Sequence, residues 1–575
     1  MQPSSDQPRS TDSGGNSALR RYGPIVAIVA VIAIVAALVI SSSGGDDDNE
    51  DATPTVPDDQ RPEGAISWSQ AQEEGLDVTF PDTCDTERGT VAIPISFAPE
   101  CYANADDNGG ATHQGVTADA ITVVIYSAQD EDAVLDFVTA PIANDDTSAQ
   151  NRETVEGYVQ LFNQYFQTYG RTVEYHFIEA SGQSSDEVAA AADAARAIEE
   201  FKPFAAIGGP VLNNAWSSAM ADAGVVCVSC GLTGGQQFLE EHAPYLYSDV
   251  QAGRQTNLHV ANYVEARLKD GKAEYGGDAV ADQDRVFGHL YIRQTEEAEA
   301  DADVLYDLLS ERGVDIADDA KTTYNLNDLA TLPEQVSSAI SKLKAAGVTS
   351  VLLQGDPYGP SIVLDEATAQ DYYPEWVISG GVLLDITAFG RTFDQEQWSH
   401  AFGISTVPAR TVPEKSVADT LYTWFKGEEP PAPDSAGVLW QAAFLFTNGV
   451  QAAGPNLTPE TFQAGLFSLK EPELRITSNY SRYGNVPFWS EIGAERDYNG
   501  PDDKGEIWWD AEATGPDELG REGRGMVRYV EGGKRYLPGD WAGSENRLFD
   551  ESESVLLYDE RPPGEEVPDY PSPAD

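Results

Sequence analysis

The sequence predicts an α/β protein of two lobes, each built from units in which a strand, a helix and a second, parallel strand follow one another. Residues 201–233 contain such a unit, because two short apolar runs end in Gly208-Gly209-Pro210 and Ser229-Cys230-Gly231 and flank a helical pattern. The helix ends MADAGVV, LSERGVD and LKAAGVT each place a Gly before a Val, which is typical of a helix that turns back toward a sheet. After residue 250 the same alternation restarts, so we expect two successive sets of units.

The two turns of the first unit predict a binding site. Parallel strands bring their carboxyl ends to one edge of a sheet, and open α/β sheets bind ligands beyond that edge. We therefore expect residues 208–214 and 229–233 to lie side by side and to offer backbone N–H groups and hydroxyls to a small molecule.

Apolar periodicity predicts the remaining elements in chain order. In the first set, strands are expected at 121–126, 173–178, 204–207 and 225–228, with helices at 147–169, from a Ser185 cap to 200, and after Asn213 or Asn214. In the second set, helices are expected at 260–268, 297–312 and 336–346, and strands at 285–292, 350–354 and 376–380. Helices follow at 417–426, 436–453 and 459–465, and strands at 506–509 and 525–530.

Composition and charge exclude one class of partner. The 575 residues include 96 acidic and 35 basic side chains, a formal net charge of −61. Such a chain repels nucleic acid, so we exclude nucleic-acid binding. We found no motif for a cofactor or a metal ion, and the run at Asp497 and Asn499 departs from a calcium loop at Pro501.

The amino-terminal segment predicts a membrane anchor. Residues 23–40 contain no charged side chain and would span about 27 Å as a helix, close to the thickness of a bilayer. Arg20 and Arg21 precede it and five acidic residues follow within residues 46–51, so we expect a single-pass protein of the cell membrane whose bulk is extracytoplasmic. A cleaved signal peptide ending near Ser41 is the alternative.

The four cysteines form two pairs by spacing. Cys84 and Cys101 lie in loop-like surroundings, and a disulfide between them would contribute about 3 kcal/mol by closing the loop. Cys227 and Cys230 leave two interpretations open. In an extended strand their Cα atoms would be about 10 Å apart, too far for a disulfide unless the strand turns early. They are then either two buried thiols or a turn-closing disulfide.

The stretch KPFAAIGGPVLNNAWSSAMADAGVVCVSCGLT resembles the core of type I periplasmic binding proteins of the leucine/isoleucine/valine-binding family. The resemblance covers roughly residues 116–469. It lies in the order and spacing of the elements more than in the identity of the residues. It implies two Rossmann-like lobes joined by three crossovers, and a small ligand in the cleft between the lobes. The restart of the alternation after residue 250 places the hinge near residues 249–253. The extensions resemble those of membrane-anchored actinobacterial members.

Ligand residues follow from the resemblance position by position. In the first lobe, Gly209, Pro210 and Asn213 match one ligand loop. Ser229, Cys230, Gly231 and Thr233 belong to a second loop, where the family holds the α-carboxylate and ammonium of an amino acid. In the second lobe, Arg293, Glu297 and Asp356 occupy loops that match the opposite wall. The family often places a carboxylate near residues 379–381, and this chain has Ser379-Gly380-Gly381 there.

Two second-lobe residues have alternative structural roles. Asp356 precedes Pro357 and is typical of a turn, and Glu297 favours the start of a helix through the helix dipole. The sequence contains no recognisable motif of a hydrolase, kinase or metalloprotease. We therefore expect a solute-binding protein rather than an enzyme. It would capture an amino acid, an amide or a similar polar ligand for an ABC-type importer and its permease; the alternative is a sensor or surface module of the same fold.

These observations divide the chain into seven parts. We expect a cytoplasmic tail (1–22), a transmembrane helix (23–40), a disordered acidic linker (41–63), a leading segment with Cys84 and Cys101 (64–115), a first lobe (116–250 with about 385–470), a second lobe with its tail (251–384 with about 471–541) and a loose acidic C-terminus (542–575).

Overall fold

The computed structural model describes residues 61–129, 131–132, 136, 139–231, 235–326, 330–356, 358–381, 383–541 and 547–574. The expected cytoplasmic tail, the transmembrane helix and most of the acidic linker lie outside these residues. Within the described ranges, no helix combines the length and the apolar character needed to cross a membrane.

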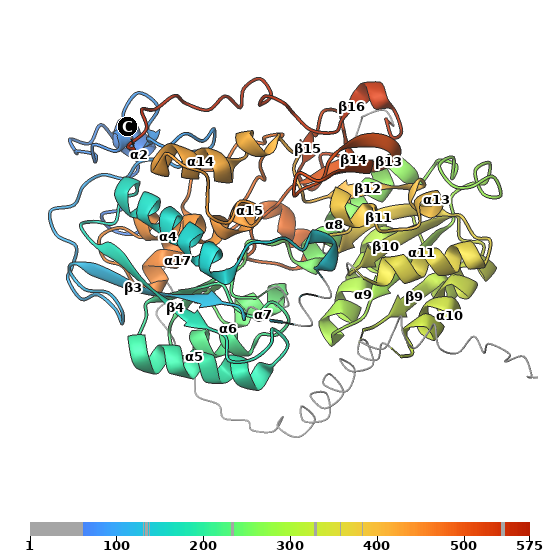
Figure 1. The fold of residues 1–575 in the computed structure, drawn as a ribbon, viewed down its shortest axis with the longest axis horizontal. Coiled ribbons are helices and arrows are strands. Elements are labelled where there is room, and N and C mark those ends of the chain that lie inside the picture. Colours follow the sequence, from blue (N-terminus) through green and yellow to red (C-terminus); the bar gives the residue numbers. More distant parts are fainter. Residues whose placement is uncertain are drawn as a thin grey trace, which may run out of the picture.

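The first lobe is built on a parallel sheet of five strands in the order β4-β3-β5-β6-β7, as the alternating pattern predicts. Its strands are β3 (Ala120–Ser127), β4 (Thr172–Glu179), β5 (Ala205–Ile207), β6 (Val226–Val228) and β7 (Leu246–Tyr247). Its helices are α4 (Ser148–Tyr165), α5 (Glu187–Phe201), α6 (Ala215–Asp222), α7 (Gln236–Glu241), α14 (Val417–Lys426), α15 (Ala436–Leu439), α16 (Gln441–Ala452) and α17 (Pro459–Phe467). In Figure 1, α5 and α6 lie below this sheet and α4 and α17 above it.

The second lobe contains a mixed sheet, for which the described residues supply nine strands. The order is β16-β14-β13-β12-β11-β10-β8-β9, and β15 pairs with β13. The strands are β8 (Phe287–Ile292), β9 (Lys321–Tyr324), β10 (Ser350–Gly355), β11 (Glu375–Gly381), β12 (Ala401–Ser405), β13 (Lys504–Pro516), β14 (Glu522–Val530), β15 (Arg535–Tyr536) and β16 (Ser554–Val555). Strands β8 to β12 pair in parallel, and the tail strands add antiparallel pairs.

Helices and single turns complete the second lobe and the connections. The helices are α8 (Gly253–Tyr263), α9 (Glu296–Glu311), α10 (Leu332–Ala345), α11 (Gly359–Ala369), α12 (Thr387–Gly390) and α13 (Gln395–Trp398). The short turns are η2 (Ala140–Ile142), η3 (Val264–Leu268), η4 (Asp318–Ala320), η5 (Pro413–Lys415), η6 (Pro487–Ile492) and η7 (Glu551–Glu553).

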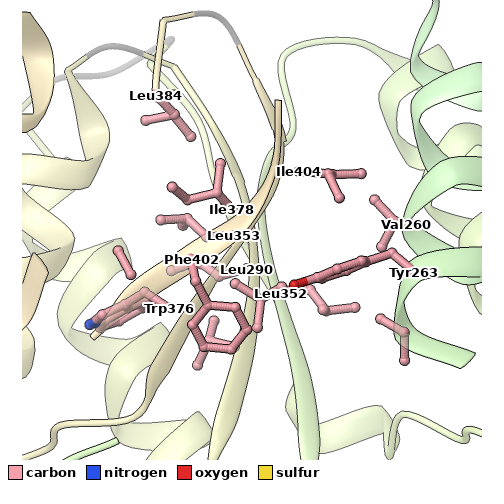
Figure 2. Packing of buried hydrophobic residues seen from close by; sticks show 14 of the residues in the cluster. Val260, Tyr263, Leu290, Leu352, Leu353, Trp376, Ile378, Leu384, Phe402 and Ile404 are labelled. Atoms are coloured by element: carbon pink, nitrogen blue, oxygen red, sulfur yellow. The ribbon is translucent and has the colours of Figure 1, made fainter. Parts of the chain in front are cut away.

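Each lobe has its own hydrophobic core, which confirms the expected division into two. The second-lobe core surrounds the parallel strands, and Figure 2 shows Trp376 packed on one side of them and Tyr263 of α8 on the other. Trp509 and Trp541 of the aromatic tail are also buried in this core. The tail therefore forms part of the second lobe.

The three Gly-Val sequences end helices as expected. Gly224, Gly313 and Gly347 have φ angles of 72°, 77° and 72°, in the left-handed region that Gly enters without a steric penalty. Each lies two residues after the last residue of its helix and directly before the Val that leads toward the sheet. One cap differs from the prediction, because Asp186 rather than Ser185 caps α5, accepting a hydrogen bond from the Ala189 N–H.

The chain crosses between the lobes three times, at residues 248–252, 406–416 and 468–503. We expected the return to the first lobe to begin near residue 385, and this boundary is wrong. Residues 385–405 stay in the second lobe, since β12 pairs with β11 and β13 and its Phe402 and Ile404 belong to the second core. The apolar run of β12 was not identified as a strand in the sequence.

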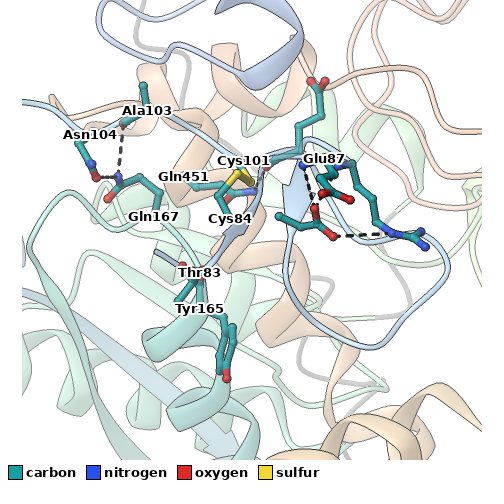
Figure 3. Close-up of a disulfide and its surroundings, with 12 residues drawn as sticks. Thr83, Cys84, Glu87, Cys101, Ala103, Asn104, Tyr165, Gln167 and Gln451 are labelled. Atoms are coloured by element: carbon teal, nitrogen blue, oxygen red, sulfur yellow. Dashed lines mark hydrogen bonds and ion pairs between the residues drawn. A yellow bond between two sulfur atoms is a disulfide. The ribbon is translucent and has the colours of Figure 1, made fainter. Parts of the chain in front are cut away.

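The leading segment is fixed to the first lobe. It contains α2 (Trp68–Glu74), β1 (Cys84–Asp85) and β2 (Thr90–Val91), and the structure joins Cys84 to Cys101 by a disulfide, as expected. Figure 3 shows the polar contacts around this bridge. Thr83 Oγ1 donates to the Tyr165 carbonyl at 2.9 Å, and Gln167 Nε2 donates to the Ala103 carbonyl at 3.3 Å. These contacts attach the segment to the end of α4.

The C-terminal residues are ordered, contrary to the expectation of a loose tail. Residues 547–574 run from the second lobe back to the first, along the upper edge of Figure 1. Glu565 accepts hydrogen bonds from the backbone N–H groups of Ile476 and Thr477, and the Tyr570 hydroxyl donates to Asp85 at 2.7 Å. Pro and acidic residues indicated disorder, but these long-range contacts fix the segment across both lobes.

Candidate functional site

The two predicted ligand loops of the first lobe lie against each other. A Cβ atom built on Gly209 would be 2.1 Å from the Cys230 carbonyl oxygen, so the loops approach as closely as two backbones can. A Cβ atom built on Gly231 would lie 3.6 Å from the Asn213 carbonyl oxygen. The expected juxtaposition is confirmed for the described residues; Thr233 lies outside them.

The strand β6 turns early, which decides between the two interpretations of its cysteines. Ser229 has a φ of 55°, a left-handed conformation, and the Cα atoms of Cys227 and Cys230 are 5.7 Å apart. At that distance the structure joins the two cysteines by a disulfide. The bridge is buried in the first core and closes the turn that carries the second loop.

The side chains of the first loop are occupied in holding the fold. The Asn213 side chain donates to the Ser184 carbonyl at 2.9 Å and accepts from the Ala215 N–H at 3.0 Å, where α6 begins. Pro210 is buried. These contacts leave the backbone of this loop, more than its side chains, as the part that can meet a ligand.

The predicted acidic residue Glu297 connects the two lobes. It lies in the first turn of α9, and its carboxylate accepts a hydrogen bond from the Gly235 N–H of the first lobe. Burial raises the pKa of Glu297, and the nearby Asp301 raises it further. Glu297 thus acts across the cleft as a contact between lobes.

The other two second-lobe residues have structural partners. Arg293 is about half exposed and forms an ion pair with Glu299 at 3.1 Å. Asp356 Oδ1 accepts from the N–H groups of Tyr358 and Gly359 at 2.7 and 2.8 Å, and its Oδ2 accepts from the Tyr324 hydroxyl. Both Asp356 oxygens are therefore satisfied at the start of α11, in agreement with the turn interpretation.

A cavity of about 2030 Å³ lies between the lobes, and we call it the interlobe cavity. Its walls come from both lobes, from the leading segment and from all three crossovers. Representative lining residues are Phe97, Gln129, Trp440 and Phe444 on the first-lobe side, Asn257, Tyr291, Asp301, Gln354 and Asp385 on the second-lobe side, and Asp249, Gln251, Thr406, Arg410, Tyr483 and Lys504 at the crossovers.

The sequence predicted a ligand site at the strand-end loops, outside the interlobe cavity. The predicted ligand residues that the structure describes (Gly209, Pro210, Asn213, Ser229, Cys230, Gly231, Arg293, Glu297 and Asp356) do not line this cavity. Their ligand role stays a prediction. The crossovers are separated from one another by about 50 to about 215 residues of chain, so no local motif could bring their side chains together. The polar run of residues 499–504, which comes shortly before the apolar residues 507–509, was the clue available in the sequence.

Two carboxyl groups on the cavity wall are shifted toward the neutral form. Burial raises the pKa of Asp249 and of Asp301. The Ser229 hydroxyl near Asp249 partly opposes the first shift, and the Arg254 ion pair at 2.8 Å partly opposes the second. Polar groups nearby form a linked network, since Gln354 Nε2 donates to Asn257 Oδ1 at 2.6 Å and Asn257 Nδ2 donates to the Asp301 carbonyl at 2.7 Å.

A pair of buried carboxyl groups lies where the first and third crossovers meet. Asp497 and Asp502 hydrogen-bond each other, and both accept from Trp489 Nε1, at 2.8 and 3.0 Å. Burial raises the pKa of Asp497 to about 7 and raises the pKa of Asp502 well above its usual range. Gln255 of α8 also donates to Asp497, so the pair connects the third crossover to the second lobe.

This pair predicts a pH-dependent stability. The folded protein retains a proton that an unfolded Asp, with a pKa near 3.9, releases, so the free energy of unfolding should fall as pH rises from about 4 to about 7. Asp502→Asn should remove the contribution of Asp502 to this fall in the free energy of unfolding. We expect the variant to gain stability over the wild type by about 1 kcal/mol or more between pH 5 and pH 8, measured by urea denaturation. An equal pH dependence in both proteins would contradict the shared proton.

Within the described ranges, no group of three or more His, Cys, Asp or Glu side chains is arranged to hold a metal ion.

No protein-family model matches the chain. Three solved structures that it resembles are bacterial solute-binding proteins. The branched-chain amino acid transporter substrate-binding protein LivJ from Streptococcus pneumoniae, in complex with isoleucine, is 14% identical, with 72% of this chain and 100% of that chain covered and a TM-score of 0.44. An ABC transporter substrate-binding protein from Desulfitobacterium hafniense in complex with leucine is 12% identical, with coverage of 73% and 99% and a TM-score of 0.42. A solute-binding protein from R. palustris in complex with 4-hydroxybenzoate is 10% identical, with coverage of 71% and 97% and a TM-score of 0.43.

One curated relative matches a short part of the sequence. The flagellar basal-body rod protein FlgG from Caulobacter vibrioides is 29% identical over 161 residues, which are 26% of this chain. The match spans 62% of the length of that relative. At these identities and TM-scores the comparisons assign neither a ligand nor an activity to this chain, whose described residues form a mixed α/β fold.

Proposed function

We propose that the protein is a membrane-anchored, extracytoplasmic solute-binding protein that captures a small polar ligand between its lobes for an ABC-type importer. The observation that carries the proposal is the interlobe cavity, which has walls from both lobes and from every crossover. A ligand in such a cavity contacts both lobes only when they are together. It therefore stabilises the closed arrangement by its higher affinity for that arrangement.

The cavity wall suits a polar ligand with an apolar portion. Asn257, Gln354 and Gln251 provide amide groups on the second-lobe and crossover sides. Phe97, Trp440 and Phe444 form an aromatic cluster with ring centroids 5.2 to 6.4 Å apart on the opposite side. A largely apolar wall that carries polar groups on both sides is typical of small-molecule sites.

A thermal-shift screen of amino acids, short peptides, amides and sugar acids tests the proposal. A ligand at 100 times its dissociation constant should increase the free energy of unfolding by about 2.7 kcal/mol. The increase should shrink in Asp249→Asn or Asn257→Leu, because both side chains line the cavity, and persist in Asp119→Asn, which is exposed outside it.

Two results would contradict the proposal. A stabilising compound whose effect is the same in all three variants would bind outside the cavity. A compound that the protein converts to a product would indicate an enzyme.

A further inference from the structure

Lys504 is a buried cation on the wall of the interlobe cavity. It is the first residue of β13, lies where the third crossover enters the second lobe, and is 3% exposed. Its ammonium donates a hydrogen bond to Thr406 Oγ1 of the second crossover. Among the residues that the structure describes, no carboxylate forms an ion pair with Lys504 within 4 Å.

The charged groups around Lys504 are committed to other partners. Asp503 accepts from Arg535 Nε of β15 at 2.8 Å, and Asp385, in the segment after β11, accepts from the Ser405 hydroxyl at 2.6 Å. Asp385 and Asp503 attract the ammonium, whereas Arg535 repels it, and Lys504 in turn disfavours a charge on His259 of α8. Burial lowers the pKa of Lys504 to about 8, so the side chain is still mostly charged at neutral pH.

A buried charge without an ion-pair partner is unfavourable, and an anion brought to it removes that cost. Lys504 has further N–H donors, and the Thr406 hydroxyl, which accepts from Lys504, still carries its own hydrogen. Both residues line the same cavity. One ammonium and one hydroxyl suit a singly charged, two-oxygen group, while the net charge of −61 disfavours a polyanion.

We propose that Lys504 and Thr406 form an anion subsite in the interlobe cavity, which binds the carboxylate group of the ligand. The inference rests on the proposed function, since it assumes that this cavity holds the solute. It adds the chemical class of the solute, a monocarboxylate. It also places the carboxylate at the crossovers, away from the loops at Gly209 and Ser229.

Three probes of equal size and different charge test the subsite: benzoate, benzamide and benzylamine. Ligand-observed NMR titrations should show wild-type protein binding benzoate at least tenfold more tightly than the other two. Lys504→Met should abolish this preference, whereas Lys534→Met, an exposed lysine outside the cavity, should retain it. Benzoate affinity should also fall as pH rises above about 8, while benzamide affinity stays constant.

The possible results distinguish a failure of the anion subsite from a failure of the proposed solute-binding function. Equal binding of the three probes, no detectable binding, or an unchanged benzoate preference in Lys504→Met would overturn the subsite. Benzylamine binding that Asp301→Asn abolishes would retain the cavity as the ligand site and overturn the carboxylate assignment. Far-UV circular dichroism reports folding of Lys504→Met; if the variant does not fold, the wild-type preference and its pH profile decide.

Discussion

Replacing Arg535 by Met is expected to lower the free energy of unfolding by about 3–5 kcal/mol. The guanidinium is 1% exposed and forms an ion pair with the fully buried Asp503. It also donates to the carbonyl groups of Ser405, Thr406 and Val407 at 2.9 to 3.3 Å. The substitution would leave a buried carboxylate without its cation and would remove one donor from each of three carbonyl groups, at the junction of two crossovers.

The measurement is urea denaturation followed by tryptophan fluorescence, because Trp508, Trp509 and Trp541 report on the second lobe. Arg524→Met is the matched control. Its guanidinium is 64% exposed and pairs with the exposed Glu512, so we expect a change within about 0.5 kcal/mol. A loss below about 1 kcal/mol for the Arg535 variant would show that the crossovers do not depend on this side chain.

Gly209→Ala is expected to destabilise the first lobe by about 1–3 kcal/mol, or more if the loops cannot separate. The new Cβ would be 2.1 Å from the Cys230 carbonyl oxygen and 2.9 Å from Trp216 Cδ1, and real Cβ contacts are essentially never below 3.0 Å. The obstacle is backbone on one side and a buried ring on the other. Neither can move without disturbing β6 or α6.

Gly231→Ala provides the control in the neighbouring loop. Its Cβ would have no neighbour closer than 3.4 Å, an ordinary contact, so we expect a change within about 0.5 kcal/mol. Both variants are compared by urea denaturation followed by far-UV circular dichroism. Equal stability of the two would mean that the loops are not in the close contact described above.

The sequence predicts the repeated part of the fold well because its information is local. The pattern of α14, residues 417 to 426, was predicted with the observed bounds, and the Gly residues that end α6, α9 and α10 were recognised by the Val that follows them. Strands β9 and β12 were missed. They are short, and the pairing with β8, β11 and β13 that defines them is not visible in a local pattern.

The contacts that are distant in sequence could not be predicted. The disorder expected after residue 541 followed from composition, whereas Tyr570 forms hydrogen bonds with Asp85 and Trp424, which lie 485 and 146 residues earlier. The candidate site also depends on contacts between residues that are distant in sequence. The strand-end loops at Gly209 and Cys230 were placed correctly beside each other, but the cavity is built where Asp249, Thr406 and Lys504 meet at the crossovers.

Hydrogen exchange with and without a compound from the thermal-shift screen tests the central claim, that the ligand is held between the lobes. The account predicts slower amide exchange in three separated segments at once: residues 249–257, 405–410 and 479–504. It also predicts little change in α5 and α10, which do not line the cavity. Protection confined to one lobe, or lying outside all three segments, would contradict it.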